Sequence, residues 1–406
     1  MRVDKTFINT INKQNVINII RDQGPIFKAE ISRVTGLSIP TIMKSTDEFI
    51  KKGLVREIGK SESSGRGKPP ELLEFIPDSY YIIGVDIGTT NIVTVLMDLS
   101  AKIIYKQMVP TGAKDCADVI INRVIDSITN TINHVNIEEE KILGIGIGMP
   151  GLLDSQNGIV QFSPDFGWEN IDLLGPIKAY FNMTIIIDNV TRAMAMGEKW
   201  FGMGHGIDNF MCINLGYGIG AAIVINGEVY SGFSGSSGEF GHMTLEKNGP
   251  LCDCGNYGCL EALSSANAIS KKARFYLEKG EESVIKDMVG GNLELIEAKS
   301  VFDAANLGDK LASEIINEAI EYLGISVASI VNLLDPELII LEGGVARAGD
   351  ILVDNLHKVV NRRKMKYAGK NTRIILSKLG EDAAAIGAAS FLLKRLIESG
   401  GAVEMV

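Results

Sequence analysis

This chain of 406 residues is poor in cysteine, in aromatic residues and in long apolar segments. Its longest uncharged run, 210–227, contains Asn214, Asn226 and several glycines, so it predicts two strands and a turn and not a membrane-spanning helix. No secretory hydrophobic region opens the sequence, and five cysteines do not form the dense framework of a small secreted domain. These features predict a cytoplasmic protein that does not enter the membrane.

Charge is unevenly distributed along the chain. The net charge is −10, which for the whole protein argues against a nucleic-acid binder. Residues 1–76, however, contain thirteen Lys and Arg against nine Asp and Glu. The length predicts two to four domains, and the apolar fraction of 46% is that of a globular protein with an ample core. A small basic module on an acidic body follows from this asymmetry.

The basic module has the pattern of a helix-turn-helix. Helical spacing of apolar residues predicts helices over 10–21 and 28–34, and a third from Ser38, which can cap it, to about residue 52. In the third helix, Ile42, Phe49 and Ile50 are expected to face inward and the polar residues outward. The candidate DNA contacts are Ser38, Pro40, Thr41, Lys44, Ser45, Arg66 and Lys68.

A wing is predicted after the third helix. Two strands, 54–58 and 72–76, flank a polar, glycine-containing and basic tip at 61–70, in which Arg66 and Lys68 can approach phosphates or a minor groove. Each feature alone has another explanation, because three-helix units also bind proteins and charged loops are commonly just solvated. Helix, polar face and wing in this order favour DNA binding.

A cluster of metal-binding side chains lies between residues 239 and 261. His242 is followed after nine residues by Cys252, Cys254 and Cys259, so three of the five cysteines fall within eight positions. Three thiolates and one imidazole form a closed tetrahedral shell for which zinc is the usual ion. The alternatives are a disulfide or redox pair beside an unrelated histidine, but clustered thiols in a reducing compartment favour a metal. Two carboxylates beside the ligands suit a polyhydroxyl molecule.

The rest of the chain predicts an α/β fold of strand, glycine turn and helix units, with ligands at strand ends. Glycine and hydroxyl residues at three such turns are candidates for phosphate binding: Asp86, Gly88, Thr89, Gly216, Gly218, Gly343 and Gly344. A tight hairpin at 86–90 and close packing of a helix on a strand at 343–344 explain the same residues equally well.

Together these motifs resemble the ROK family of repressors, open reading frames and sugar kinases. The resemblance is carried by the segments 86–90, 148–151, 216–220, 239–242, 252–261 and 343–344, of which the cysteine block is the most specific. With a winged helix-turn-helix in front, the chain is similar to the sugar-responsive repressors of that family. The resemblance implies a two-lobed, actin-like sugar-kinase fold, a monosaccharide in the cleft and a homo-oligomer, either a dimer or a tetramer.

Functional residues of the family fall on matching positions of this sequence. The resemblance implies sugar contacts at Asn189, Glu239, His242 and Glu261 and a structural zinc ion on His242, Cys252, Cys254 and Cys259. His242 can serve both because one ring nitrogen can coordinate zinc while the other donates to a sugar oxygen.

Two departures from the family pattern bear on catalysis. The kinases resemble one another in a Glu-Asn-Asp segment whose last aspartate is the general base, whereas this chain has Asp188, Asn189 and Val190 there. Losing a positioned base typically removes about 10² to 10⁴ of rate. Tyr217 stands where the kinases usually have threonine, and its ring would crowd a triphosphate.

The sequence therefore predicts a non-enzymatic, sugar-responsive repressor that binds double-stranded operator DNA. Residues 1–78 are expected to form the winged head, 79–190 a small α/β lobe to which a C-terminal helix at 386–406 returns, and 191–385 a larger lobe with the zinc site. A linker around 76–81 is expected to transmit sugar binding to the head. The alternatives are an ATP-dependent sugar kinase with a fused head and a scaffold that binds a protein partner.

Overall fold

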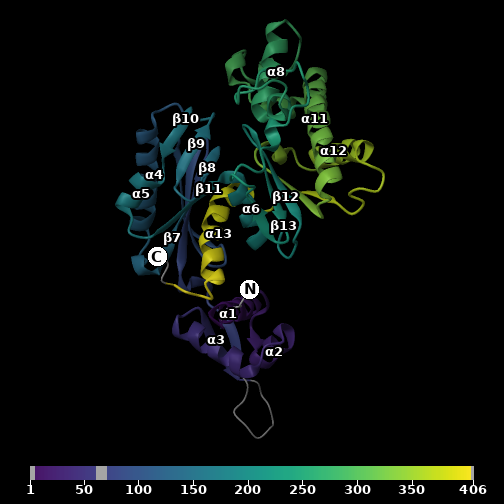
Figure 1. Cartoon of the computed structure of the whole chain (residues 1–406). Coiled ribbons are helices and arrows are strands. Elements are labelled where there is room, and N and C mark those ends of the chain that lie inside the picture. Colours follow the sequence, from purple (N-terminus) through teal and green to yellow (C-terminus); the bar gives the residue numbers. More distant parts are fainter. Residues whose placement is uncertain (1–4, 61–70, 404–406) are drawn as a thin grey trace.

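The computed structural model describes residues 5–60 and 71–403, which form a small head and a two-lobed body (Figure 1). The head lies at one end of the molecule, and two helices, α6 and α13, run between the lobes (Figure 1). This is the α/β fold with an N-terminal winged head that the sequence predicts.

The head is a winged helix-turn-helix. Its helices are α1 (Lys5–Gln23), α2 (Lys28–Thr35) and α3 (Ile39–Lys51), and its three-stranded sheet is β1 (Ile26–Phe27), β3 (Glu71–Phe75) and β2 (Val55–Lys60). Gly36 ends α2 in the left-handed conformation, with φ of 70°, and the Ser38 hydroxyl caps α3 by accepting from the Thr41 backbone N–H. Helix α1 begins earlier than the predicted residue 10.

Each lobe is built on a five-stranded sheet, and the two sheets have the same topology. In both, three antiparallel strands in sequence order are followed by two strands that add in parallel on the other side of the first. The first sheet, in spatial order, is β11 (Thr184–Asn189), β7 (Ile142–Met149), β4 (Tyr81–Ile87), β5 (Asn91–Asp98) and β6 (Ile103–Pro110). The second is β14 (Glu228–Tyr230), β13 (Ile219–Ile225), β12 (Phe210–Leu215), β15 (Leu338–Glu342) and β16 (Arg373–Leu376). We refer to the units on these sheets as lobe 1 and lobe 2.

Helices complete both lobes. Lobe 1 also contains a small sheet of β8 (Leu152–Asp154), β9 (Ile159–Ser163) and β10 (Trp168–Asp172), with α4 (Ala117–His134) and α5 (Leu174–Tyr180). Lobe 2 contains α7 (Leu260–Ser264), α8 (Ala266–Glu278), α9 (Ile285–Met288), α10 (Ala298–Asn306), α11 (Lys310–Leu334) and α12 (Asp350–Arg363). Short 3₁₀ helices lie at Pro77–Ser79, Glu139–Lys141, Phe240–His242, Leu293–Leu295, Val345–Ala348 and Gly380–Asp382.

Helices α6 (Val190–Phe201) and α13 (Ala383–Glu398) pack against each other at backbone distance. A Cβ atom added to Gly387 of α13 would lie 1.8 Å from the Ala193 carbonyl oxygen of α6. A Cβ added to Gly146 of β7 would lie 1.9 Å from the Ala388 carbonyl oxygen. Because no side chain separates them, the two helices and the first sheet form one tightly packed unit.

The head is docked on this unit. Apolar side chains of α1, including Val16, Ile17 and Ile20, belong to the same buried cluster as Leu392 and Leu396 of α13. The Lys52 ammonium donates to the Gly401 carbonyl at 2.9 Å, and the Tyr80 hydroxyl donates to the Lys52 carbonyl at 3.1 Å. The head therefore shares a hydrophobic core with the body.

The C-terminal helix differs from its predicted bounds, whereas the signalling role of the linker at 76–81 stays a prediction. The C-terminal helix runs over Ala383–Glu398 and not over 386–406, because Gly400 and Gly401 take φ of 69° and 76° and end it. Backbone hydrogen bonds hold the linker at 76–81 to both units: the Ile76 N–H donates to the Leu54 carbonyl of the head, and the Leu99 N–H of lobe 1 donates to the Pro77 carbonyl. Head and body are thus tied on both sides of the linker.

Among the described helices, none combines the length and the apolar character that crossing a bilayer requires.

Candidate functional site

A cavity of about 860 Å³ opens between the lobes, and side chains from both line it. The four predicted sugar contacts, Asn189, Glu239, His242 and Glu261, all line this cavity. So do the predicted phosphate-loop residues Asp86, Gly88, Thr89, Gly216, Gly218, Gly343 and Gly344. A volume of this size accommodates a sugar-sized or larger ligand.

The four predicted metal ligands meet on one loop beside the cavity. The ligand atoms of His242, Cys252, Cys254 and Cys259 all lie within 4.8 Å of one another. Sharp turns make this approach feasible: Gly258 has φ of 67°, and a Cβ there would lie 1.7 Å from the Glu246 carbonyl oxygen. The four ligands therefore come together in one compact donor set. We call the segment that carries them, residues 242–259, the metal loop.

The donor set fits a tetrahedral ion. The Cys254 and Cys259 sulfurs are 3.8 Å apart, and the Cys252 sulfur is 3.7 Å from His242 Nδ1. An ion with metal–sulfur bonds of about 2.3 Å in tetrahedral geometry requires sulfur separations of about 3.8 Å. Burial raises the pKa of the Cys252 and Cys259 thiols, so a cation is needed to keep them as thiolates.

His242 has its two nitrogens in different surroundings. Nδ1 faces the thiols of the metal loop, while Nε2 is 3.7 Å from a carboxylate oxygen of Glu239. With a metal on Nδ1, the tautomer is fixed and Nε2 carries the hydrogen. Burial raises the pKa of Glu239, and the nearby His242 and Arg192 act in the opposite direction. Glu239 and His242 thus present an acceptor and a donor side by side.

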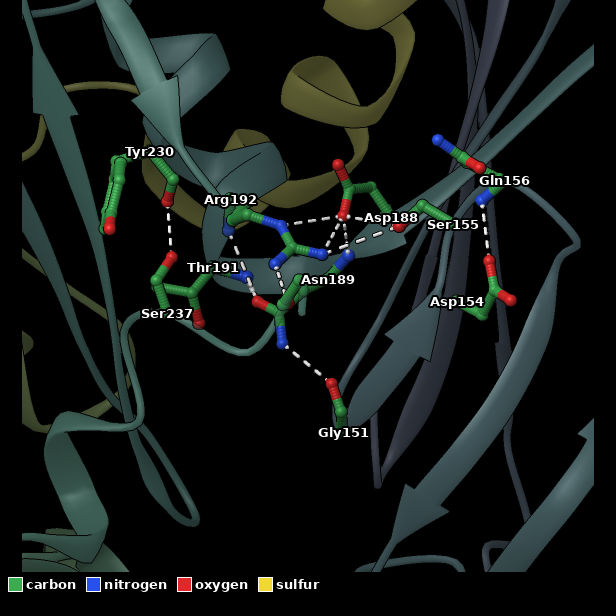
Figure 2. A network of polar contacts seen from close by, with 11 residues as sticks. Gly151, Asp154, Ser155, Gln156, Asp188, Asn189, Thr191, Arg192, Tyr230 and Ser237 are labelled. Atoms are coloured by element: carbon green, nitrogen blue, oxygen red, sulfur yellow. Dashed lines mark hydrogen bonds and ion pairs between the residues drawn. The ribbon is translucent and has the colours of Figure 1, made fainter. Parts of the chain in front are cut away.

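Asn189 is held by three hydrogen bonds. Its Oδ1 caps α6 by accepting from the backbone N–H groups of Thr191 and Arg192, and its Nδ2 donates to the Gly151 carbonyl at 3.0 Å (Figure 2). A primary amide has two N–H hydrogens, so one remains for a ligand. Asn189 can therefore donate a single hydrogen bond into the cavity without losing its cap.

Glu261 is placed by the glycine loop between β12 and β13. One carboxylate oxygen accepts from the Ile219 backbone N–H at 2.8 Å. A Cβ on Gly218 would lie 2.3 Å from that same oxygen, and a Cβ on Gly220 would lie 2.6 Å from the Thr191 hydroxyl. These two glycines make room for protein side chains, which accounts for them without a phosphate group.

Asp188 is committed to an ion pair. Arg192, one turn along α6 and only 4% exposed, donates to Asp188 Oδ1 through Nε at 2.7 Å and also through Nη2 (Figure 2). The Ser155 hydroxyl donates to the same oxygen at 3.0 Å, and Arg192 Nη1 donates to the Gly235 carbonyl. Gly235 belongs to lobe 2, so Arg192 joins the lobes and holds the Asp188 carboxylate through its Oδ1 atom.

Val190 is the first residue of α6 and lines the cavity beside Met194. Its side chain packs with Met194, Ala383 and Ala384 in a small apolar cluster. Among the residues at this helix start, Val190 offers no proton acceptor, Asn189 is an amide and Asp188 is ion-paired. Val190, which lines the cavity at the start of α6, therefore presents an apolar side chain to it.

Two carboxyl groups lie at the phosphate-loop end of the cavity, Glu342, which is buried, and Asp86, which is half-buried. Asp86 is the next-to-last residue of β4 and Glu342 the last of β15, and burial raises their pKa values to about 7 and about 8. Glu342 is 3% exposed, and neither of its oxygens has a conventional hydrogen-bond partner, although the Cys212 thiol lies beside it. Gly343, with φ of 89°, packs on Asn214 and Leu215, whereas Gly344 faces open space.

The structure supports part of the predicted DNA surface. Pro40 and Lys44 are exposed on α3, and Thr41 is half-buried. The prediction that Ser45 faces outward is wrong. Ser45 is 1% exposed and its hydroxyl donates to the Thr41 carbonyl, because it lies between Ile42 and Phe49 on the inward face of the helix. Arg66 and Lys68 lie outside the described residues.

Two residues with structural roles at the site were missed by sequence reasoning. Arg192 follows Asp188 at the i,i+4 spacing typical of helical ion pairs, which was the available signal. Asp165, in the turn between β9 and β10, has no such signal. It lines the cavity from lobe 1, and partial burial together with Glu261 and Asp253 raises its pKa to about 6.

Comparison with known proteins agrees with this architecture. The ROK family model matches residues 82–395. The xylose repressor of Caldicellulosiruptor bescii is 31% identical, covering 97% of this chain and 98% of the repressor. A glucokinase of Thermotoga maritima is 36% identical, covering 78% of this chain and 98% of the kinase. A solved ROK family transcriptional regulator, a homolog of the E. coli MLC protein, superposes with a TM-score of 0.83 and 29% identity, covering 97% of this chain and 98% of that regulator.

The share of this chain that each relative covers differs between the repressors and the kinase. The repressor and the regulator match this chain almost from end to end, whereas nearly the whole glucokinase corresponds to 78% of it. The lobes are thus common to both kinds of relative. On the family match and on these similarities, the chain belongs to the ROK family.

Proposed function

We propose that this protein is a sugar-responsive transcriptional repressor. The head binds double-stranded operator DNA, a sugar ring binds between Asn189, Glu239, His242 and Glu261, and two or more copies assemble on a palindromic site. Similarity to a xylose repressor and to an N-acetylglucosamine repressor supports this proposal, as does the winged helix-turn-helix.

The observation that carries the proposal is the absence of an uncommitted base at the start of α6. Asp188 is ion-paired with Arg192, and Val190 is apolar, while Glu239, His242 and Glu261 still line the cavity. A site that holds a sugar without activating its hydroxyl binds but does not phosphorylate. The sugar then acts as a signal.

We infer that the metal is a structural zinc ion. All four positions are taken by His242 and the three cysteines of the metal loop, which leaves no open coordination site for a reactant. When bound, the ion keeps the thiols ionised and holds the loop that leads into α7. It thereby orients the His242 ring toward the cavity.

Helix α6 offers a direct route from the sugar to the head. Its first turn carries the Asn189 cap and Arg192, and its last turn carries Trp200, which contacts Arg21 of α1. A sugar changes DNA affinity only through different contacts in two arrangements of the protein. Sugar contacts at Asn189 move α6 together with α13 and the first sheet, and the head, which is docked on this unit, moves with them.

The test combines sugar and DNA binding on the purified full chain. A thermal-shift screen of monosaccharides identifies a stabilising sugar, and fluorescence anisotropy then measures affinity for DNA from upstream of the protein's own gene, with and without that sugar. We expect the sugar to weaken DNA binding at least tenfold, within the usual range of coupling between sites. Unchanged DNA affinity across the whole panel contradicts the proposal.

A sugar kinase with a fused head is the second candidate, because a glucokinase is 36% identical over the lobes. It predicts sugar-phosphate formation when the protein is incubated with MgATP and the stabilising sugar. Turnover that disappears on purification to homogeneity belongs to a contaminant, whereas turnover that the Asn189→Ala variant lacks belongs to this cavity and favours the kinase.

A further inference from the structure

A second cavity of about 360 Å³ adjoins the sugar cavity on the far side of the metal loop. Its walls come from the metal loop, from α7 and from the facing sides of α8 and α11. Nothing in the proposed sugar site uses this space. It is large enough for a further small polar group.

The two cavities are neighbours with a shared wall. They share Asp165 of lobe 1, Tyr217 and Gly218 of the glycine loop, and Asp253 and Glu261 at the metal loop. Glu261 therefore borders both spaces, and a ring held by Glu261 lies at the entrance to the second cavity. Tyr217 and Asp253 also line both spaces, so a substituent on that ring would enter the second cavity beside them.

The chemistry of the second cavity is that of a sugar subsite. Asn267 and Lys271 lie one turn apart on α8, and among the described residues neither side chain has a hydrogen-bond or ion-pair partner. Four other polar side chains of the wall are paired within the protein, since Lys272 pairs with Glu318 and Tyr322 donates to Glu246. Uncommitted donors are available for ligand hydroxyl oxygens.

Apolar surface accompanies these donors. Tyr217 is 54% exposed at the junction and Leu251 is 62% exposed on the metal loop, and Phe275 of α8 is half-exposed. Carbohydrate sites combine such apolar faces, which cover C–H groups, with a few placed polar side chains. Asp165, Glu261 and Asp253 line both cavities, and their carboxylate oxygens can accept ligand hydroxyl hydrogens.

We propose that the second cavity binds a second sugar unit, so that the effector is a disaccharide or another glycoside. This rests on the proposed function, because the first unit occupies the sugar cavity. Asn267 and Lys271 contact hydroxyl groups of the second unit, and Tyr217 covers the junction between the two units.

The test is isothermal titration calorimetry of the zinc-loaded full chain with matched pairs of sugars: xylose and xylobiose, glucose and cellobiose, glucose and maltose, N-acetylglucosamine and chitobiose. We expect at least one disaccharide to bind about tenfold tighter than its own monosaccharide. If every disaccharide binds no tighter than its unit while a monosaccharide binds, the second subsite is wrong and the sugar site stands. If no sugar binds at all, the proposed function itself fails.

Amino-acid substitutions test which residues make the disaccharide bind more tightly than the monosaccharide. Asn267→Ala with Lys271→Ala should return the disaccharide to the affinity of the monosaccharide and leave the monosaccharide unchanged. Lys286→Ala, a lysine of lobe 2 outside both cavities, is the matched control and should alter neither. A disaccharide preference that survives the double substitution contradicts the assignment of these residues.

Discussion

The Arg21 guanidinium lies over the Trp200 ring, 4.3 Å from its centroid, and joins the head to the helix that begins in the cavity. Arg21 is in the last turn of α1 and Trp200 in the last turn of α6. Arg21 Nη1 is buried without a hydrogen-bond partner, while Nε is bonded to Asp22. The ring face is thus a principal partner of this cation inside the interface.

Replacing Arg21 by alanine should weaken the response of DNA binding to sugar. A cation–π contact is worth about 0.5–2 kcal/mol, so the ratio of operator affinities without and with sugar should fall by about two- to thirtyfold. Fluorescence anisotropy at several sugar concentrations measures this ratio. Arg33→Ala, an exposed arginine of α2, should leave the ratio unchanged even if it alters DNA affinity itself. An unaltered ratio in Arg21→Ala excludes this contact from the signalling route.

Removing one metal ligand should affect both stability and sugar binding. In Cys254→Ser the metal content should fall from one ion per chain to near zero, with a lower melting temperature and weaker sugar binding, because the loop that orients His242 is released. Metal analysis by mass spectrometry and calorimetry measure these effects. Cys116→Ser changes an exposed cysteine far from the loop and should retain one ion. Full metal content in Cys254→Ser would show that Cys254 is not a ligand.

Two glycines of the cavity should respond differently to alanine. In Gly218→Ala the new methyl lies 2.3 Å from Glu261 Oε2, so the carboxylate must move and sugar affinity should fall at least tenfold. In Gly344→Ala no heavy atom lies within 4 Å of the new methyl, and sugar affinity should be unchanged. Calorimetry with the stabilising sugar compares the two variants. Equal affinities would mean that Gly218 does not position Glu261.

Glu342 should make the protein less stable as pH rises. Its pKa is about 8 in the folded chain against an ordinary value of 4.5, so between these values the unfolded chain releases a proton that the folded chain retains. The stability contributed by this group is complete below pH 4.5 and is lost as pH rises toward 8. Glu342→Gln should therefore raise the melting temperature at pH 8 by about 2–4 °C or more, with little change at pH 5. Glu278→Gln, on an exposed turn of α8, should follow the wild type at both values.

Lys44 should contribute to DNA affinity in a salt-dependent way. It is exposed on α3, so Lys44→Ala should weaken binding to operator and to unrelated duplex alike and reduce the slope of log affinity against log salt by about 1. Ser45→Ala should leave this slope unchanged, since Ser45 is buried beneath the helix. A slope that Lys44→Ala does not alter would place Lys44 away from the phosphates.

Features that depend on local spacing are the ones that sequence reasoning predicts here. The metal loop is predictable because three of its ligands lie within eight residues, and the cap at Ser38 because it depends on the next turn of helix. The prediction that Ser45 faces outward was wrong, because a shift of one residue along a helix decides whether a side chain lies on the inward or the outward face. A short polar residue carries too little hydrophobic signal to fix that phase.

Contacts between distant segments were not predictable. Arg21 and Trp200 meet only because α1 docks on α6 and α13, which the order of elements along the chain does not specify. A phosphate role for Gly218 stays a prediction, because a glycine-rich turn has the same sequence whether it makes room for a ligand or for Glu261. Only the folded arrangement distinguishes the two.

The glycines between α6, α13 and the first sheet have a consequence for how the protein can change over generations. At Gly84, Gly146 and Gly387 even a methyl group would meet a backbone carbonyl within 2.0 Å, so this central spine is closed to variation. The cavity lies at one end of this spine, and the head, whose helix α3 carries predicted DNA contacts, shares a buried core with α13 at the other end. Ligand preference and operator preference can therefore diverge separately while the spine that joins them stays fixed.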